Sequence, residues 1–441
     1  MTKENSTYII KTYGCQMNEH DSERISYILE SLGYTQTEDL MSADLIIYNT
    51  CIIRENAELK IYGHLGSMKS LKEKKPELII AVCGCMMEIE EAREVIRKTY
   101  RHVDIVFGTK NISSLPYLIT QHLMANERVI DTEAVDDIDN LQKAVRKSDV
   151  SAYINIIYGC DNFCSYCIVP YTRGRESSRS AQSILEEVRG LVSQGFKEIT
   201  LLGQNVNSYG KDLHPCSSFS KLLMELDRLE GLERVRFMTS HPKDFSDELI
   251  EAIRQGEKVC EHIHLPLQSG STRILKEMNR KYTAEEYSQI IEKLRESIPN
   301  IAITTDIIVG FPGESDEDFE QTIEMVEKIG FDQAFLFKYS KRTGTRAATM
   351  EEQIPEEVKS QRFQRILDRI NDICYEKNQH YLDSIQEVLV EGYSKGNKDM
   401  LTGRTRTNKI VHFPKGSVQV GELVSLKITG FNSFALEGEM I

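Results

Sequence analysis

The first third of the chain alternates short apolar runs with amphipathic segments. Five runs predict strands, at 7–13 ("TYIIKTY"), 44–49 ("DLIIYN"), 78–82 ("LIIAV"), 103–108 ("VDIVFG") and 128–132 ("RVIDT"). The intervening segments fit helices, the first beginning at Asn18 as N-cap and others covering 55–75 and 88–99. Strands that are apolar throughout and separated by helices are typical of a parallel sheet covered on both faces. We therefore predict an open parallel α/β sheet.

A polar stretch without a clear hydrophobic period follows at 132–149, and the alternation then resumes. Six further strands are predicted, at "AYINII", "EITLLG", "RVRFMT", "HIHLPL", "ITTDIIVG" and "AFLFKYS". Helices fill the gaps, for example at 180–195, and a long charged helix covers roughly 355–378. A full eight-stranded barrel needs about 250 residues, so six βα units predict a partial (βα)6 barrel.

The last sixty residues change character. The runs "IQEVLVEGYS", "MLTGRTRTNKIVHF", "LVSLKITGFN" and "ALEGEMI" have strand composition and are separated by Gly, Asn and Lys turns. They predict a small all-β barrel of the OB-like kind. The predicted organisation is an N-terminal sheet domain at 6–123, a linker at 124–145, the partial barrel at 146–376 and the β-barrel at 379–441.

Composition describes a water-soluble protein of more than one domain. The chain has 441 residues, 40% of them hydrophobic and 28% charged. No apolar run approaches the ~18 residues of a membrane span, and no secretory signal is visible, so we expect a cytoplasmic protein without a membrane partner. The net charge of −14 argues against nucleic acid when taken over the whole chain. Residues 395–415 reverse that argument locally, because they carry six basic side chains and one acid.

Three cysteines stand close together in "YGCDNFCSYC", at positions 160, 164 and 167. Structural zinc requires four closed ligands, a thioredoxin-like pair leaves Cys160 idle, and three buried structural cysteines at this spacing are improbable. An iron–sulfur cluster takes thiolates at such spacings. With three protein ligands, one iron is left open, and an open metal position is typical of catalytic sites. The missing fourth cysteine is therefore interpreted as a vacancy for a substrate.

A second set of three cysteines lies where predicted strands end. Cys15 follows the first strand, Cys51 the second and Cys85 the third. Ligands of open parallel sheets bind at the carboxyl ends of the strands, so these thiols are expected to meet at one edge. Strand alternation places Cys83 inside the third strand, and we therefore assign Cys85 as the ligand. Cys216, Cys260 and Cys374 match no motif and are expected to be ordinary core or surface residues.

The cysteine motif, with Tyr166 before its last cysteine, resembles the radical S-adenosylmethionine (SAM) enzymes. Further segments resemble the methylthiotransferases among them, namely "KTYGCQMNEHDSE", "NTCIIRENAE", "VCGC", "GCDNFCSYCIVPYTRGRESSR", "LLGQNVNSYG", "TSHP", "LPLQSGS" and "DIIVGFPGE". The resemblance runs from about residue 8 to the C-terminus. Within the methylthiotransferases, these segments most resemble the MiaB-type branch, which acts on tRNA. The β tail is similar to the TRAM domain, an RNA-binding module.

The resemblance implies two 4Fe–4S clusters and SAM as cofactors. Cys160, Cys164 and Cys167 would hold the radical cluster, and Cys15, Cys51 and Cys85 an auxiliary cluster. The implied reaction adds a methylthio group to C2 of N6-isopentenyladenosine (N6-dimethylallyladenosine), next to the anticodon of tRNA. It consumes two SAM molecules, a sulfur atom and an electron. The implied partners are the anticodon stem-loop of that tRNA, a sulfur donor and an electron donor, and the chain is expected to act as a monomer.

Other candidate site residues follow from strand ends and local charge. SAM contacts are expected from Tyr166 and from five residues that end the second, third and fourth barrel strands: Gly203, Gln204, Asn205, Ser240 and Gln268. RNA contacts are expected from Arg404, Arg406 and Lys409, because basic residues near aromatics on a β surface suit RNA. No catalytic acid or base is assigned. The arginines that follow the cluster loop, Arg173, Arg175 and Arg179, either contact SAM or phosphate or belong to a solvated loop.

Two rival functions stay open. Within the same class, the substrate is threonylcarbamoyl-adenosine in tRNA or an aspartate of a ribosomal protein, although "YGCQMN" favours the isopentenyl branch. In another class, the chain is a non-catalytic, metal-stabilised RNA-binding protein. Two open three-thiol sites argue against that second alternative.

Overall fold

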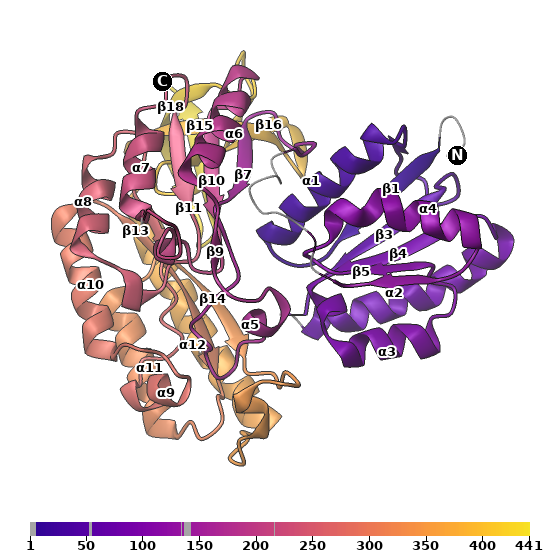
Figure 1. The fold of residues 1–441 in the computed structure, drawn as a ribbon. Helices are drawn as coiled ribbons and strands as arrows, with labels where there is room; N and C mark the ends of the chain where they lie inside the picture. The colour runs from indigo at the N-terminus through magenta and orange to yellow at the C-terminus, as the bar shows by residue number, and fades with distance from the viewer. Residues whose placement is uncertain (1–5, 53–54, 134, 136–142, 216) are drawn as a thin grey trace. The chain divides into compact units, whose positions relative to one another are not determined.

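The computed structural model describes residues 6–52, 55–133, 135, 143–215 and 217–441 (Figure 1). It contains two compact units. The N-terminal unit consists of Met1–Lys147, Tyr158–Asp161 and Ile168–Arg179, and the barrel unit of Ser148–Ile157, Asn162–Cys167 and Ser180–Ile441. The chain therefore returns twice to the N-terminal unit after the predicted domain border, and the β tail shares a unit with the partial barrel.

Six parallel strands form the sheet of the N-terminal unit, in the order β2-β1-β3-β4-β5-β6. They are β1 (Thr7–Thr12), β2 (Thr35–Gln36), β3 (Leu45–Thr50), β4 (Ile79–Gly84), β5 (Ile105–Phe107) and β6 (Val129–Asp131). The five strands read from the sequence are present, and the short edge strand β2 is additional. β6 is the strand predicted at 128–132; it pairs with β5 and overlaps the range 124–145 that was assigned to the linker. Positions 134 and 136–142 of that linker lie outside the described residues.

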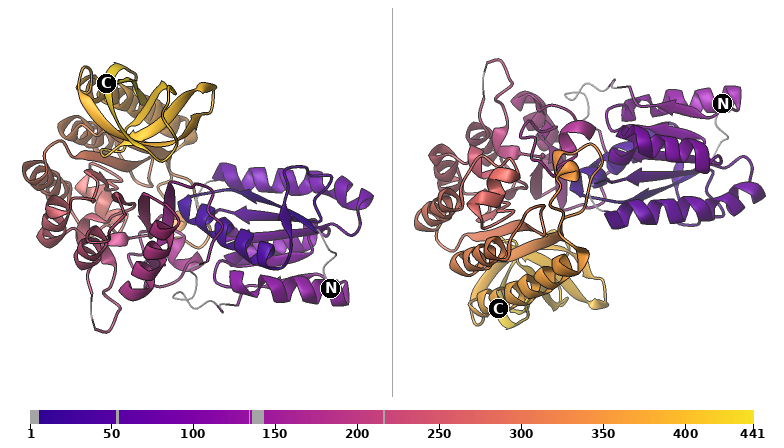
Figure 2. Two further views of the ribbon diagram at one scale, coloured as in Figure 1. Left: turned by 90° about the horizontal axis from the view of Figure 1, so that it is seen from above. Right: turned by 90° about the horizontal axis from the view of Figure 1, so that it is seen from below.

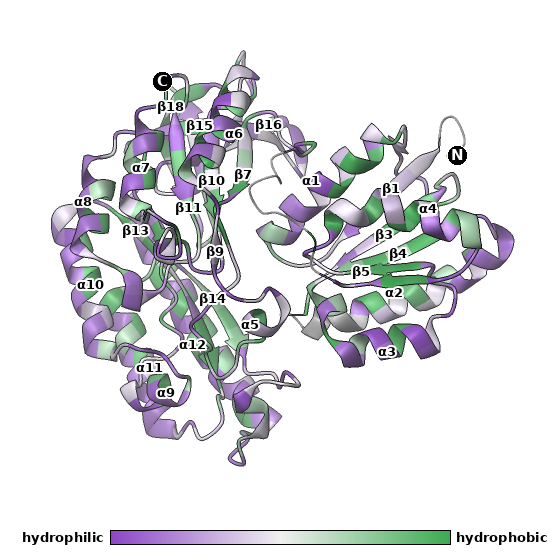
Figure 3. Cartoon of the chain, viewed as in Figure 1, coloured by the Kyte–Doolittle hydropathy of each residue, from purple (hydrophilic) through white to green (hydrophobic). Residues whose placement is uncertain are grey.

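Helices cover both faces of this sheet, as the continuous apolar runs predict. They are α1 (Gln16–Ser31), α2 (Glu55–Lys74), α3 (Glu90–Thr99) and α4 (Leu115–Ala125). Consecutive strand residues point to opposite faces. Leu45 and Ile47 accordingly share a core with α1 and α4, whereas Ile46 shares one with α2 and α3. The central strands β3, β4 and β5 stand out as green in Figure 3.

The start of α1 differs from the sequence prediction. The helix begins after Cys15, which occupies the N-cap position, and no side chain caps it. Asn18, the predicted N-cap, lies within the helix and is fully buried. Its amide is used elsewhere, because it donates hydrogen bonds to the carbonyl oxygens of Tyr13 (3.1 Å) and Thr50 (2.8 Å). Long-range hydrogen bonds of this kind leave no local sequence signal.

The barrel unit contains the six predicted parallel strands. They are β7 (Ser151–Asn155), β10 (Glu198–Leu202), β11 (Arg234–Phe237), β12 (His262–His264), β13 (Ala302–Val309) and β14 (Gln333–Lys338). They pair as two three-stranded halves, β11-β10-β7 and β12-β13-β14. The Ser240 amide joins the halves by donating to the His264 carbonyl at 3.1 Å. This open arrangement confirms a partial barrel.

Helices follow the barrel strands in sequence. They are α6 (Ala181–Ser193), α7 (Phe219–Asp227), α8 (Asp247–Gln255), α9 (Thr272–Glu277), α10 (Ala284–Ser297), α11 (Asp316–Ile329) and α12 (Glu356–Gln379). The connection after β7 instead holds the short elements β8 (Ile157–Tyr158), α5 (Val169–Thr172) and β9 (Ser177–Ser178). None of the helices in the described ranges combines the length and the hydropathy that a bilayer span requires.

The tail closes into a five-stranded barrel, in the order β15-β16-β17-β19-β18. Its strands are β15 (Ile385–Ser394), β16 (Asn397–Thr405), β17 (Ile410–Pro414), β18 (Leu423–Phe431) and β19 (Ala435–Met440). The single predicted run at 400–413 is thus broken by a turn at 406–409. Figure 2 shows this barrel in yellow beside α12. The Asn378 amide of α12 donates to the Asn432 carbonyl at 2.7 Å, which ties the two together.

Candidate functional site

The strand-end cysteines of the N-terminal unit follow three neighbouring strands. Cys15 lies after β1, Cys51 directly after β3, and Cys85 directly after β4. Because β1, β3 and β4 are parallel and adjacent, these residues lie at one edge of the sheet. Cys51 and Cys85 are buried and Cys15 is partly exposed.

Two glycines bring the backbones at this edge into close contact. A methyl group on Gly14 would lie 2.8 Å from Cβ of Cys51. A methyl group on Gly84 would lie 2.3 Å from the Thr50 carbonyl oxygen, and Gly84 has φ +95°, which glycine alone adopts readily. Both glycines directly precede a cysteine. The close approach therefore sets the spacing of the three thiols.

The three thiols are close enough to interact electrostatically. Burial raises the pKa of Cys85 to about 12, the Arg173 guanidinium opposes this rise, and negative charge at Cys51 and Cys15 adds to it. The Cys15 thiol donates to Oδ1 of Asn18 at 3.6 Å. Asn18 therefore links the end of β1 to the end of β3, a role that the sequence reasoning missed.

Cys83 lies inside β4 and packs on the other side of the sheet from Cys85. Cys83 belongs to the core shared with α1 and α4, and Cys85 to the core shared with α2 and α3. Burial raises the pKa of the Cys83 thiol well above its usual value. These positions agree with assigning Cys85 as the ligand, and that assignment stays a prediction.

Replacing Cys83 by alanine is expected to leave the iron and sulfide content of the protein unchanged. The alanine removes one buried sulfur from the core shared with α1 and α4, and it leaves the predicted ligands Cys15, Cys51 and Cys85 in place. Iron and acid-labile sulfide after anaerobic purification measure this. The matched control is Cys85→Ala, for which we expect loss of the auxiliary cluster. If Cys83→Ala lost that cluster while Cys85→Ala kept it, the assignment would be reversed.

Cys160 lies in the N-terminal unit. Its amide donates to the Gly174 carbonyl at 3.1 Å. The preceding Gly159 has φ +75°, and a methyl group there would lie 2.0 Å from the Arg175 carbonyl oxygen. The loop that carries Cys160 is thus packed, backbone against backbone, on the segment that ends at Arg179.

Cys164 and Cys167 lie in the barrel unit, where the residues around 278–280 hold their loop. The Ser165 amide donates to the Met278 carbonyl at 2.9 Å, and the Asn279 side chain donates to the Phe163 carbonyl at 2.8 Å. Nη1 of Arg280 lies 3.4 Å from Sγ of Cys164. Phe163 has φ +46°, a strained conformation of the kind found at functional sites.

Both predicted ligand sets consist of cysteine thiols, which iron–sulfur clusters take as ligands. Within the described ranges, no three His, Cys, Asp or Glu side chains converge as ligands of one ion. A 4Fe–4S cluster takes one thiolate per iron, so its ligands do not need to meet at one point. Arg173 and Arg280 each donate to a thiol, which suits an anionic thiolate-bound group.

Buried polar atoms without a partner lie at the ends of the barrel strands. Four buried atoms there have no hydrogen-bond partner among the described residues: Oδ1 of Asn205, Oγ of Ser240, Nε2 of His241 and Oε1 of Gln268. Buried polar groups normally find partners, so exceptions at one edge of a barrel require an explanation. A bound polar ligand would supply such donors and acceptors, and SAM contact at these atoms stays a prediction. Three of these four residues were predicted from the sequence.

Backbone strain occurs at the same strand ends. Thr239 has φ +58° and Gln268 has φ +69°, although neither is a glycine. Such residues cost about 1–3 kcal/mol each and persist where function requires them. Gly203 fits a packing role, because a methyl group there would lie 2.4 Å from Cγ2 of Ile157. Gln204 is partly buried next to it, and Tyr166 packs on a small apolar cluster containing Met278 and Phe311. SAM contact by these three residues, like that by Asn205, Ser240 and Gln268, stays a prediction.

Among these four residues, His241 carries a side chain that can change its charge. Burial lowers its pKa to about 2, and the cations Arg280, Lys243 and Lys211 add to the effect. The imidazole is therefore neutral at physiological pH. Its Nδ1 accepts from the Lys243 amide at 3.1 Å, so the proton resides on Nε2 and is available to a ligand.

The predicted RNA-contacting residues are engaged inside the barrel unit. Nη2 of Arg406 lies 2.8 Å from Oε1 of Glu261, and Nζ of Lys409 lies 3.1 Å from Oδ1 of Asp332. Arg404 pairs with Glu391 at 3.0 Å. The prediction of RNA contact is therefore not supported for Arg406 and Lys409, because their cations already neutralise carboxylates on the barrel.

The turn at 404–406 is itself bound by arginines of the barrel strand β11. Arg234 donates to the Arg404 carbonyl at 2.7 Å, and Arg236 donates to the carbonyls of Thr405 (2.8 Å) and Arg406 (2.9 Å). Arg236 also pairs with Glu198 at 2.8 Å, and both side chains are buried. These hydrogen bonds fix residues 404–406 of the β-barrel on strand β11.

A different part of the same basic stretch is exposed. Lys395 and Lys398 lie on the β15–β16 hairpin, and Lys415 follows β17. Nζ of Lys415 donates to the Tyr393 hydroxyl at 2.9 Å and lies 4.9 Å from that ring's centroid. We call Tyr393, Lys395, Lys398 and Lys415 the hairpin tip.

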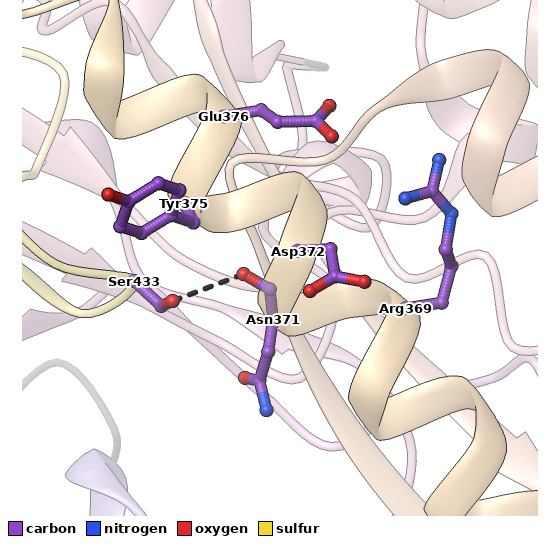
Figure 4. Close-up of a pocket in the computed structure, with 6 residues that line it drawn as sticks. All are labelled: Arg369, Asn371, Asp372, Tyr375, Glu376 and Ser433. Carbon is purple, nitrogen blue, oxygen red and sulfur yellow. Dashed lines mark hydrogen bonds between the residues drawn. The ribbon is translucent and has the colours of Figure 1, made fainter.

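A surface pocket of about 300 Å³ lies apart from all of these residues (Figure 4). It is lined by Arg369, Asn371, Asp372, Tyr375, Glu376 and Ser433. The Ser433 hydroxyl donates to the Asn371 carbonyl at 3.1 Å. The lining carries two carboxylates and one guanidinium, so its net negative charge would repel a phosphate. Cys260 and Cys374 are buried, as expected of core residues, and Cys216 lies outside the described residues.

Three family models match the chain in the predicted order. The Uncharacterized protein family UPF0004 matches residues 7–108, the Radical SAM superfamily matches 154–326, and the TRAM domain matches 379–441. Among solved structures, the radical S-adenosylmethionine methyltransferase TsrM from Kitasatospora setae has a similar fold. Its TM-score is 0.58 at 14% identity, covering 78% of this chain and 75% of TsrM.

Curated relatives match over nearly the full length. A tRNA-2-methylthio-N(6)-dimethylallyladenosine synthase from Finegoldia magna is 55% identical over 435 residues, covering 99% of this chain and 94% of the relative. The synthase of the same name from Acetivibrio thermocellus is 55% identical over 441 residues, covering 100% and 92%. Together with the order of the three matched families, this similarity shows that the chain belongs to the MiaB-type tRNA methylthiotransferases, a family of radical SAM enzymes.

Proposed function

We infer that this chain transfers a methylthio group to C2 of N6-isopentenyladenosine, next to the anticodon of tRNA. The observation that carries this inference is the second set of thiols, Cys15, Cys51 and Cys85, at one sheet edge. SAM cleavage requires only the C-x3-C-x2-C motif, so a second open thiol site fits a separate task, the delivery of sulfur. The names of the full-length relatives agree with that task.

Two 4Fe–4S clusters and SAM are the cofactors. Cys160, Cys164 and Cys167 would hold the radical cluster, and Cys15, Cys51 and Cys85 the auxiliary cluster. When bound, these groups supply a carbon-centred radical and a transferable sulfur, which side-chain acids and bases cannot provide.

The chain's own residues bind SAM and orient it. Asn205, Ser240 and Gln268 present buried polar atoms to SAM at the barrel strand ends. His241 is neutral and offers its Nε2–H, which can donate a hydrogen bond without adding charge to the pocket. Arg280 holds Cys164 and also donates to the Tyr282 hydroxyl at 3.0 Å. These contacts fix the cofactor's orientation relative to the cluster loop.

The hairpin tip is the proposed RNA-contacting surface of the β-barrel. Its three lysines are exposed, and within the described residues none of them forms an ion pair with a carboxylate. Exposed Lys side chains contact phosphates as point charges, and Tyr393 offers a face on which an unstacked base can lie. Arg404 and Arg406 are partly exposed although each pairs with a carboxylate, and RNA contact by either of them stays a prediction.

Replacing Lys395, Lys398 and Lys415 by alanine is expected to weaken tRNA binding and flatten its salt dependence. Each lost phosphate contact should lower the log–log salt slope by about 0.7–0.9, because fewer counterions are released. Filter binding or fluorescence anisotropy across a salt titration measures this slope.

The matched control removes three lysines elsewhere, Lys98, Lys293 and Lys328, which are paired with carboxylates on helices. It lowers the net charge equally and should leave the slope near that of the parent. Equal slopes for both variants would show that the hairpin tip is only a solvated surface.

Mass spectrometry of tRNA nucleosides tests the reaction itself. A strain lacking its own methylthiotransferase should accumulate N6-isopentenyladenosine, and expression of this chain should convert it into the 2-methylthio derivative. Conversion of threonylcarbamoyl-adenosine instead, or modification of a ribosomal-protein aspartate, would move the chain to another branch. A colourless protein containing zinc after anaerobic purification would favour a non-catalytic RNA-binding protein.

The remaining partners are part of the same proposal. The enzyme acts in the cytoplasm as a monomer and takes sulfur and electrons from separate donors. Light scattering of the anaerobically purified protein checks the monomer, with a mass near the 50.5 kDa of one chain as the expected result.

A further inference from the structure

Arg173 is buried in the N-terminal unit, although it belongs to the segment that follows the radical motif. It comes six positions after Cys167 and directly after α5. Its side chain is 4% exposed. Ile168 of the same segment packs in the core formed with α2 and α3. The segment is therefore an integral part of the N-terminal unit, and the solvated loop that the sequence left open is excluded for Arg173.

The Arg173 guanidinium contacts the auxiliary thiol site at three atoms. Nε lies 3.2 Å from Sγ of Cys85. Nη2 lies 3.2 Å from Oδ1 of Asn18, which also accepts from the Cys15 thiol. Nη2 further lies 3.1 Å from Oδ2 of Asp21. The Arg173 guanidinium thus links the Cys85 thiol, the Asn18 amide oxygen that binds Cys15, and the buried Asp21 carboxylate.

Other arginines lie near Arg173 in the N-terminal unit. The fully buried His20 has its pKa lowered by burial and by four guanidinium groups, those of Arg146, Arg24, Arg179 and Arg173. The carboxylates paired with them are Asp21, with Arg24 and Arg173, and Glu23, with Arg146. Three buried guanidinium groups, those of Arg24, Arg146 and Arg173, thus pair with these two carboxylates. Buried charge requires compensation, and three thiolates carrying an iron–sulfur group supply negative charge at this place.

Hydrogen bonds to cluster sulfurs tune iron–sulfur chemistry. An N–H donor at a ligating sulfur withdraws electron density, and a nearby cation stabilises the added electron of the reduced cluster. Both effects raise the reduction potential. Arg173 supplies both, because its Nε–H points at Cys85 and its charge is buried beside that thiol.

We propose that Arg173 is a positioning residue of the auxiliary cluster, holding the Cys85 thiolate by an N–H···S hydrogen bond and raising the cluster's reduction potential. The proposal rests on the proposed function, since it requires an auxiliary cluster at Cys15, Cys51 and Cys85. It deepens that function by assigning control of the sulfur-bearing site to the segment that directly follows the radical motif.

The test uses the full chain with Cys160, Cys164 and Cys167 replaced by alanine, so that only the auxiliary cluster contributes a signal. Its midpoint potential is measured by a redox titration followed by electron paramagnetic resonance. Arg173→Met, which removes charge and donors, should shift the potential to a more negative value. Arg173→Lys, which keeps the charge but loses the planar fork, should shift it less. The matched control is Arg175→Met in the same segment, whose side chain is 74% exposed, and it should leave the potential unchanged.

A second measurement covers the case in which Arg173→Met does not fold. The Fe–Sγ stretching frequency of Arg173→Lys, measured by resonance Raman spectroscopy, should rise as the hydrogen bond to Cys85 is lost. Full iron content with an unmoved potential and frequency would overturn the role of Arg173 alone. Absence of iron from the parent triple variant would overturn the two-cluster assignment together with this proposal. Neither readout depends on tRNA or on turnover.

Discussion

SAM cleavage is expected to disappear when Cys160, Cys164 and Cys167 are replaced together by alanine. About half of the iron should remain, because an auxiliary cluster of the same type is held by other residues. The expected loss is complete, because the open iron that would hold SAM belongs to the cluster bound by these three cysteines. Formation of 5′-deoxyadenosine from SAM in the presence of a strong reductant measures the reaction, and iron analysis measures cluster occupancy.

The reciprocal variant is the control. Replacing Cys15, Cys51 and Cys85 should also remove about half of the iron, but SAM cleavage should persist while methylthio transfer to tRNA stops. If either triple variant lost all of its iron and remained folded by circular dichroism, the model of two independent clusters would be wrong.

Replacing Gly84 by alanine is expected to remove the auxiliary cluster and to destabilise the N-terminal unit. Gly84 has φ +95° and ψ −173°, a region that only glycine adopts readily. The added methyl group would also lie 2.3 Å from the Thr50 carbonyl oxygen. The ends of β3 and β4, which directly precede Cys51 and Cys85, must therefore move apart. Strain and overpacking together cost about 2–6 kcal/mol. Hydrogen exchange of β3 and β4 peptides, together with iron content, measures both effects.

The control variant Gly33→Ala distinguishes the effect of steric overlap at Gly84 from the effect of backbone strain alone. Gly33 also has positive φ (+85°), but a methyl group there meets no atom within 4 Å. It should cost about 1–3 kcal/mol and keep both clusters. A Gly84→Ala protein with full iron content and an equal loss of stability would show that the close approach at Gly84 does not position the cysteines.

The sequence predicted well whatever depends on local periodicity. Continuous apolar strands buried on both faces give a strong local signal, so the six barrel strands and every strand of the N-terminal sheet except the short edge strand β2 were found. The same logic placed Cys85 after a strand end and Cys83 within the strand, as β4 shows. The ends of the barrel strands likewise indicated Asn205, Ser240 and Gln268, and the structure finds unpartnered polar atoms on these three residues.

Features that depend on distant partners were not predictable. Arg406 and Lys409 read as an exposed basic stretch, because nothing local reveals that Glu261 and Asp332 receive their charges. Asn18 read as an N-cap, although its amide binds carbonyl groups of two strand ends. Arg173 carried no sign of its contact with Cys85, which lies 88 positions away in the chain. In each case a long side chain reaches a partner that only the tertiary fold supplies.

The return of residues 168–179 to the N-terminal unit has a consequence for dissecting the protein into fragments. A fragment that stops at Lys147 would lack Ile168 from its core and Arg173 from the carboxylate of Asp21. A fragment that starts at Ser148 would carry this segment without its binding surface and expose apolar residues to water. Neither half is a self-sufficient expression product. A gene fusion or a shuffling event that exchanges the N-terminal half must therefore exchange the stretch after Cys167 with it, so the two regions are expected to be inherited together.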